Sequence, residues 1–120
     1  IECKGTKEED YSKIKKLLES KNRPDGIVTS VERLAISVYL ACHELNVSIP
    51  GALKMVAFST LETAPILNPP LTTIVQPAFD IGKTATELLF KEIERKPNNG
   101  EDQVVILPSS LIERTSSQIF

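Results

Sequence analysis

Residues 68–93 read NPPLTTIVQPAFDIGKTATELLFKEI and carry the pattern that decides the fold. A proline pair precedes residues 72–75, TTIV, whose β-branched side chains favour a strand. After Pro77, apolar residues recur at helical spacing, and Asp80 is placed to cap the helix that they form. A short strand followed at once by an amphipathic helix is typical of an α/β fold.

The N-terminal part of the chain shows the same alternation of helix and strand. Thr6 and Glu9 have the spacing of a capping box, in which each side chain satisfies an amide at the start of a helix. A second capping-box pattern joins Thr29 to Glu32, directly after the short apolar run at residues 27–28. We therefore expect a helix after Thr6, a brief buried strand, and a second helix opened by Thr29.

The second helix is apolar nearly all round and needs cover on two sides; we expect its own sheet on one side and a partner subunit on the other. Asn46 is suited to the left-handed cap at its C-terminus. Residues 53–58, LKMVAF, are typical of a buried parallel strand, and residues 104–114 predict two short strands or one strand bent at Pro108. The whole order predicts an α/β fold with a largely parallel sheet flanked by helices.

Composition sets the class of protein. With 120 residues, 41% of them hydrophobic and 25% charged, the chain has the composition of one ordinary globular domain. A net charge of -2 gives no field that would hold a polyanion, so this region is not expected to touch nucleic acid. Cys3 and Cys42 lack metal-ligand spacing and are expected to be free thiols in the cytoplasm. No apolar run reaches the length of a membrane span, and the first residues lack a signal-peptide pattern.

Motifs of catalysis are missing from the sequence. His43 is the only histidine, and its place near a helix C-terminus indicates a capping or interface role. One histidine offers no metal cluster and no histidine-centred triad, and neither GxxxxGK[ST] nor GxGxxG occurs. We therefore predict a protein that is not an enzyme and that uses no cofactor or metal.

Several short motifs, taken in order, resemble one family. RPDGIV, IPGALKMVAF, PPLTTIVQP, DIGKTATELL and LPSSLIER together resemble the C-terminal part of the lac-repressor and purine-repressor family of bacterial transcription regulators. The resemblance runs from about residue 4 to residue 116. It implies a core of two α/β lobes, like that of periplasmic sugar-binding proteins, with a small effector bound between them and a separate helix-turn-helix for the operator.

The resemblance also implies how this chain is divided. Residues 1–75 would form part of the C-terminal lobe of the effector-binding domain. Residues 76–120 would supply the crossover helix and the terminal strands that normally pack with the N-terminal lobe. Residues 72–75 would then be the crossing, stiffened by the prolines on either side. The helix at residues 80–95 would then lack the lobe that buries its apolar stripe, so we expect either a dimer that exchanges elements or a piece of a longer protein. The opening residue Ile1 also indicates a trimmed piece.

Polar residues at the ends of two predicted strands depart from the family pattern. Val31 and Glu32 stand where the family has Asn-Asp, and Ser59 and Thr60 stand where it has one or two Asp. Val31 has no side-chain hydrogen bond to offer, and Ser59 lacks a carboxylate. The pattern therefore argues against a simple sugar held in the usual manner.

The candidate effector-binding residues are Ser30, Glu32, Arg33 and Ser59. Each has an alternative reading. Glu32 is also the last member of the second capping box, and Arg33 is also a solvated helix residue. Both serines follow predicted parallel strands, where open α/β sheets bind ligands, but serines at strand ends are also common turn residues.

The expected partners follow from the resemblance. They are a small-molecule effector, a second copy of the chain in a homodimer, and DNA through a helix-turn-helix that is absent from this chain. Candidate interface residues are Val38, Tyr39, Ile66 and Leu67, and the alternative is that Val38 and Tyr39 cover the core of their own lobe. A sugar-binding component of a transport system is the alternative function. A receiver-like signalling domain is disfavoured, since no acidic cluster follows the predicted strands.

Overall fold

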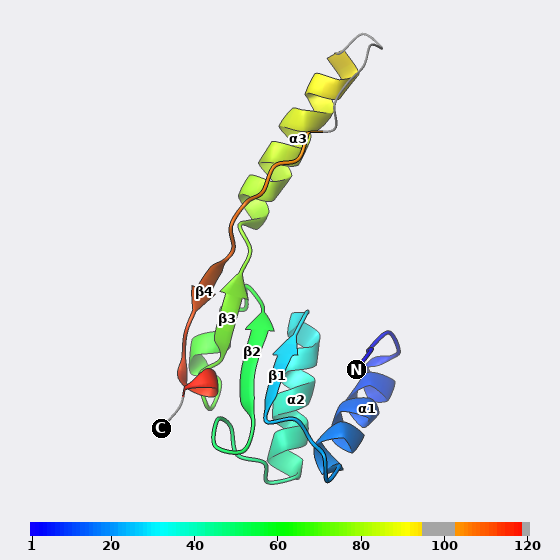
Figure 1. The fold of residues 1–120 in the computed structure, drawn as a ribbon, viewed down its shortest axis with the longest axis vertical. Coiled ribbons are helices and arrows are strands. Elements are labelled where there is room, and N and C mark those ends of the chain that lie inside the picture. Colours follow the sequence, from blue (N-terminus) through cyan, green and yellow to red (C-terminus); the bar gives the residue numbers. More distant parts are fainter. Residues whose placement is uncertain (95–102, 119–120) are drawn as a thin grey trace. The chain divides into compact units, whose positions relative to one another are not determined.

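The structure is a computed structural model of the chain and describes residues 1–94 and 103–118 (Figure 1). The elements follow the order α1 (Lys7–Glu19), β1 (Gly26–Thr29), α2 (Glu32–Glu44), β2 (Lys54–Phe58), the 3-10 turn η1 (Ala64–Ile66), β3 (Thr72–Val75), α3 (Ala78–Glu94), β4 (Ser110–Ile112) and the 3-10 turn η2 (Thr115–Ser117). The strands form one sheet in the order β1-β2-β3-β4, in which β1 to β3 are parallel. The predicted α/β fold with a largely parallel sheet is confirmed.

Contacts divide the chain into two units. The first contains residues 1–75 and the segment that begins at Leu111, and the second contains residues 76–110. The division after Val75 falls where the sequence places the crossing. The segment that begins at Leu111 is grouped with the first unit, and it is hydrogen-bonded to β3. The assignment of the two units to lobes stays a prediction.

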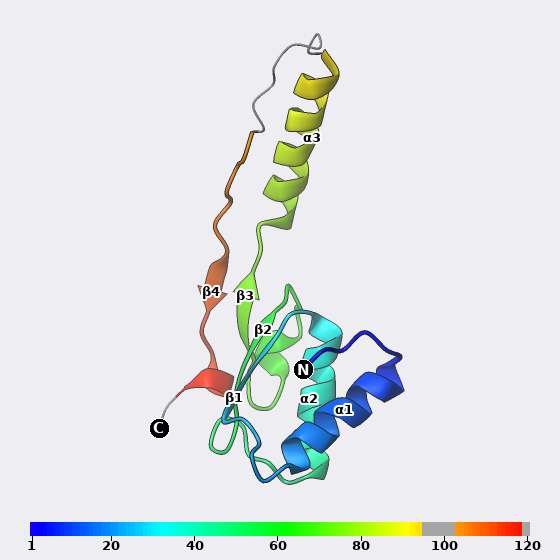
Figure 2. The same cartoon turned by 45° about the vertical axis from the view of Figure 1, so that its right-hand side comes forward.

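The core of the first unit lies between its helices and one face of the sheet. α2 packs against β1 and β2, and α1 packs against α2 (Figure 2). This arrangement explains the cover that the apolar α2 finds: β1 and β2 supply one side and α1 supplies another. The largest of the fully buried apolar side chains are Leu18, Val38, Leu53, Met55 and Leu71.

Two of the predicted helix ends are confirmed. Thr6 Oγ1 accepts a hydrogen bond from Glu9 N at 3.2 Å, and Glu9 Oε2 accepts one from Thr6 N at 2.9 Å, so the first capping box is formed. Asn46 has a φ of 53°, as expected for the left-handed residue after a helix. Local side-chain chemistry therefore decides where α1 begins and where α2 ends.

The second predicted capping box is wrong. The N-cap of α2 is Val31, which makes no side-chain hydrogen bond, and Glu32 is the first helical residue. Thr29 Oγ1 is buried and has no hydrogen-bond partner. The box fails because the carboxylate of Glu32 is engaged with residues after β2 and does not turn back to its own helix.

The second unit contains α3 and the described residues 103–110. α3 begins at Ala78, so Asp80 lies within its first turn instead of capping it. No described residue of α3 is buried. Val105 and Leu107 line a depression along this helix together with Ile81 and Leu88. Of the predicted closing strands, only residues 110–112 form one, because the described residues 103–109 have no strand partner.

Candidate functional site

A single carboxylate oxygen joins the C-terminal ends of β1 and β2. Glu32 Oε1 accepts hydrogen bonds from Ser59 Oγ at 3.0 Å, from Thr60 N at 2.8 Å and from Thr60 Oγ1 at 3.3 Å. Glu32 opens α2 just after β1, and Ser59 directly follows β2. Two of the predicted site residues, Glu32 and Ser59, are therefore in direct contact.

The parallel pairing of β1 and β2 explains this contact. Val28 is paired with Val56 and Thr29 with Ala57, so both strands end at the same edge of the sheet. The N-terminus of α2 lies at this edge, and Glu32 is its first helical residue. Periodicity alone could place each residue at a strand end, but it could not show that their side chains meet.

Ser59 is held by its surroundings from several directions. Its hydroxyl donates to Glu32 and accepts from Leu61 N at 2.9 Å, and its main-chain N donates to Ile74 O at 3.2 Å. Its side chain is buried. Ser59 therefore acts on the edge mainly by fixing Glu32, whose described hydrogen bonds all use Oε1 and leave Oε2 for a further donor.

Two further residues at this edge are open to solvent. Val31 is 42% exposed, and Ser30 is exposed beside it. Ser30 also lines a small pocket of about 130 Å³, whose other walls include Ile1, Cys3, Val28 and Leu34. The edge thus combines a fixed carboxylate with an exposed apolar side chain and a hydroxyl.

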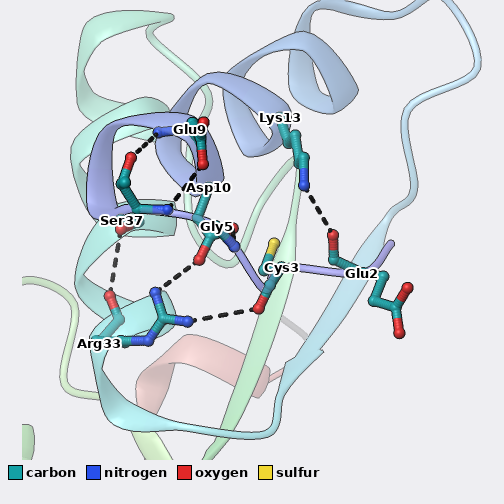
Figure 3. Close-up of polar contacts among 9 residues, drawn as sticks. Glu2, Cys3, Gly5, Glu9, Asp10, Lys13, Arg33 and Ser37 are labelled. Atoms are coloured by element: carbon teal, nitrogen blue, oxygen red, sulfur yellow. Dashed lines mark hydrogen bonds and ion pairs between the residues drawn. The ribbon is translucent and has the colours of Figure 1, made fainter.

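Arg33 lies in a different environment from the one expected. Its Nη1 donates to Asp10 Oδ2 at 2.6 Å, and its Nη2 donates to the main-chain oxygen of Cys3 at 3.4 Å (Figure 3). Gly5 N donates to the other oxygen of Asp10 at 3.1 Å, so both carboxylate oxygens are occupied. The hydrogen bond from Arg33 lowers the pKa of the Asp10 carboxyl. Arg33 therefore ties α2 to α1 and to the N-terminal segment, and an effector contact for it stays a prediction.

The candidate interface residues fall into two groups. Val38 is 1% exposed and belongs to the core, which favours the alternative that it covers its own lobe. Tyr39 donates its hydroxyl to Pro69 O at 2.7 Å and is partly buried, as is Leu67. Ile66 is 80% exposed. The candidates therefore differ widely in how much surface they offer a partner.

Sequence reasoning did not name Asp10, Leu40 or Thr60 as candidates, although the sequence pattern indicated the positions of the first two. Asp10 lies four residues before Ile14 and eight before Leu18, so helical periodicity places it on the buried face of α1. Leu40 is 50% exposed on α2 and lies two residues from the buried Val38, on the opposite side of the helix. Thr60 had no signal of its own, because its role depends on where Glu32 lies.

Metal-ligand clusters and membrane-spanning helices are both absent from the described part of the chain. Among residues 1–94 and 103–118, no group of three or more His, Cys, Asp or Glu side chains is placed to hold a metal ion. Within the same residues, no helix has the length and apolar character needed to cross a bilayer. Cys3 and Cys42 are free thiols.

Comparison with known proteins gives a consistent result. Residues 2–117 match the family described as a periplasmic binding protein-like domain. A lactose operon repressor of Rhizobium radiobacter is 38% identical over 113 residues, which are 92% of this chain and 96% of that relative. A ribose operon repressor of Halalkalibacterium halodurans is 40% identical over 81 residues, 68% of this chain and 24% of that protein. A LacI family transcriptional regulator of Enterococcus faecalis, solved with bound ribose, matches with a TM-score of 0.75 at 30% identity and covers 98% of this chain and 42% of its own.

The parallel sheet flanked by helices and the match over residues 2–117 define a periplasmic-binding-protein-like α/β region. The chain belongs to the lac-repressor family of transcription regulators, in which it corresponds to the effector-binding region. It spans about a quarter of the ribose operon repressor and less than half of the solved regulator. The relatives are named as repressors, which does not favour the transport alternative.

Proposed function

We propose that this chain binds a small-molecule effector at the C-terminal edge of β1 and β2, as part of a homodimeric cytoplasmic repressor. The observation that carries the proposal is the carboxylate of Glu32, which Ser59 and Thr60 fix at that edge. Ligands of open α/β sheets bind outside the carboxyl ends of the strands. DNA contacts would come from a helix-turn-helix outside this chain, and the region itself would be non-catalytic.

The chemistry of the edge indicates the class of effector. A fixed carboxylate accepts hydrogen bonds and donates none, so it selects a hydroxyl or an amine. Val31 is exposed beside it and suits an apolar patch of the ligand. The bound ribose of the Enterococcus faecalis regulator supports a sugar or a related metabolite. We propose a small polyhydroxylated molecule that also presents an apolar face.

Regulation would follow from linkage between two binding events. An effector that binds better to one arrangement of the lobes shifts the population toward that arrangement. If operator affinity differs between the arrangements, the effector changes it by the same coupling free energy. Catalysis is not required at any point of this mechanism.

Dimerisation would place two DNA-binding regions on the half-sites of an operator. The exposed side chains of Leu40 and Ile66 support an interface on the first unit, with Tyr39 and Leu67 contributing their accessible parts. Val38 is too deeply buried to contribute directly.

The experiment is a calorimetric titration of the complete regulator with ribose and a panel of other pentoses and hexoses. Replacing the carboxylate in Glu32→Gln should weaken binding about tenfold or more, because hydrogen bonds to a charged group are strong. Glu19→Gln is the matched control, since Glu19 is exposed at the end of α1. Equal affinity of the Glu32→Gln variant and the unchanged protein would remove Glu32 from the site. Absence of binding across the panel would exclude a pentose or hexose effector.

A further inference from the structure

A second cluster of hydrogen bonds in the first unit shares no residue with the contacts of Glu32. It joins Thr72 of β3 to the segment that follows β4, across 42 to 45 residues of sequence. Thr72 is 1% exposed and Ser116 is fully buried. A buried hydroxyl that loses its hydrogen-bond partner destabilises the fold. Several such hydroxyls together therefore hold β3 and the segment after β4 in one relative position.

Ser116 connects β2 with β3 at the point where their pairing begins. Its hydroxyl donates to Met55 O at 2.6 Å and accepts from Thr72 N at 2.8 Å. Its main-chain N donates to Pro70 O at 2.9 Å. The first paired residues of these strands are Val56 and Thr72, so Ser116 lies at the start of the ladder.

Arg114 connects the end of β4 with β3. Its main-chain N donates to Thr72 Oγ1 at 2.8 Å, and its main-chain O accepts from the same hydroxyl at 2.9 Å. Its Nη1 donates to Leu71 O at 2.7 Å and to Thr73 Oγ1 at 3.0 Å. Arg114 is therefore hydrogen-bonded to β3 through both its main chain and its side chain.

The location of this cluster gives it a role beyond stability. The chain leaves the first unit after Val75, at the end of β3, and re-enters it at Leu111, within β4. Both passages therefore run in strands that the same cluster holds at their far ends. Only residues 73–75 in one passage and residues 111–113 in the other separate this cluster from the second unit.

We propose that Thr72, Arg114 and Ser116 form a clamp that makes the two passages bend together, and that this clamp couples effector binding to operator affinity. The inference rests on the proposed function. If each passage bent independently, the second unit could take many arrangements. An effector held by the first unit would then bind all of these arrangements about equally well, and a ligand with equal affinity for them shifts none of their populations. A clamp that fixes both passages reduces the number of arrangements among which the effector selects.

The first test uses hydrogen exchange on the 120-residue chain. Thr72→Val removes the hydroxyl that holds Arg114 while keeping the shape of the side chain. Amides of residues 110–114 should exchange about tenfold faster, because a buried hydrogen bond is lost, while those of β1 and β2 keep their rates. Thr63→Val is the matched control, since Thr63 is exposed and makes no side-chain capping bond. Unchanged exchange at residues 110–114 would overturn the clamp, and so would an equal rise in β1 and β2, which indicates only a contribution to the core.

The second test measures coupling in the complete regulator, with the sugar that binds best in the panel above as probe. Thr72→Val and the second variant Ser116→Ala should bind this sugar with unchanged affinity. The ratio of operator affinities with and without the sugar should fall toward one. A ratio equal to that of the unchanged protein would overturn the proposal, as would a parallel loss of sugar binding. Failure of the proposed function is separate, because it appears as unchanged sugar affinity in Glu32→Gln.

Discussion

α2 and α3 are similarly apolar helices, but α2 has buried residues and the described residues of α3 have none. In α2, Ala35, Val38 and Ala41 are almost completely buried, because β1, β2 and α1 lie against them. In α3, Phe79 is 81% exposed and Ile93 is 68% exposed. Apolar character shows that a helix needs cover, whereas burial depends on which other elements reach it. Stability in this chain is therefore expected to depend on the first unit and much less on α3.

The largest effect should come from matched leucine truncations in the two units. Leu18→Ala removes a core side chain that is 2% exposed and should lower the free energy of unfolding by about 2–5 kcal/mol. Leu89→Ala acts at a side chain that is 60% exposed and should change it by no more than about 0.5 kcal/mol. Urea denaturation of the 120-residue chain measures both. Equal losses in the two variants would show that α3 is covered in solution.

The Asp10–Arg33 pair should give a smaller effect that depends on pH. Arg33 lowers the pKa of Asp10 in the folded chain, so the pair stabilises the fold above the unfolded value of about 3.9. That stability is lost as the pH falls through the lower folded pKa. Asp10→Asn should therefore reduce stability at neutral pH, and the difference from the unchanged chain should shrink in acid.

Thermal melts between pH 7 and the acid range measure this difference. Glu19→Gln serves again as a control, because it also removes one carboxylate from α1 but at an exposed position. A difference between Asp10→Asn and the unchanged chain that stayed constant down to the lowest pH would show that Asp10 acts through packing and not through its charge.

The smallest effect is expected at Tyr39, which links α2 to the loop before β3. Burial raises the pKa of its hydroxyl to about 12, so the group stays protonated and can donate to Pro69 O throughout the ordinary pH range. Tyr39→Phe removes only this hydrogen bond and should cost about 1 kcal/mol. Urea denaturation checks the value, and a stability equal to that of the unchanged chain would show that water replaces the hydroxyl.

The elements that sequence reasoning placed well have strong local signals. The capping box of Thr6 and Glu9 and the left-handed residue Asn46 depend on groups only a few residues apart. The strand at residues 72–75 has β-branched side chains between prolines and was located correctly. The candidate site could be predicted in part from the sequence. The parallel strands indicated one shared edge, and Glu32 and Ser59, which are in contact there, were both named as candidates.

Other features depended on distant parts of the chain. Thr29 and Glu32 have the spacing of a capping box, but donors after β2 engage the carboxylate first. Arg33 has the pattern of a solvated helix residue, yet a buried carboxylate on α1 binds it. The clamp of Thr72, Arg114 and Ser116 joins residues that no local pattern connects.

By itself, the sequence determined the order of helices and strands, the parallel α/β class and the family to which the chain belongs. These properties follow from periodicity, from capping and turn residues, and from short motifs in a given order, all of which act over a few residues. Only the tertiary structure decided which polar groups pair, which apolar helix is covered, and where the returning segment is anchored. Those outcomes depend on side chains that approach one another only after the strands have paired, because hydrogen bonds and packing are set by distance in space.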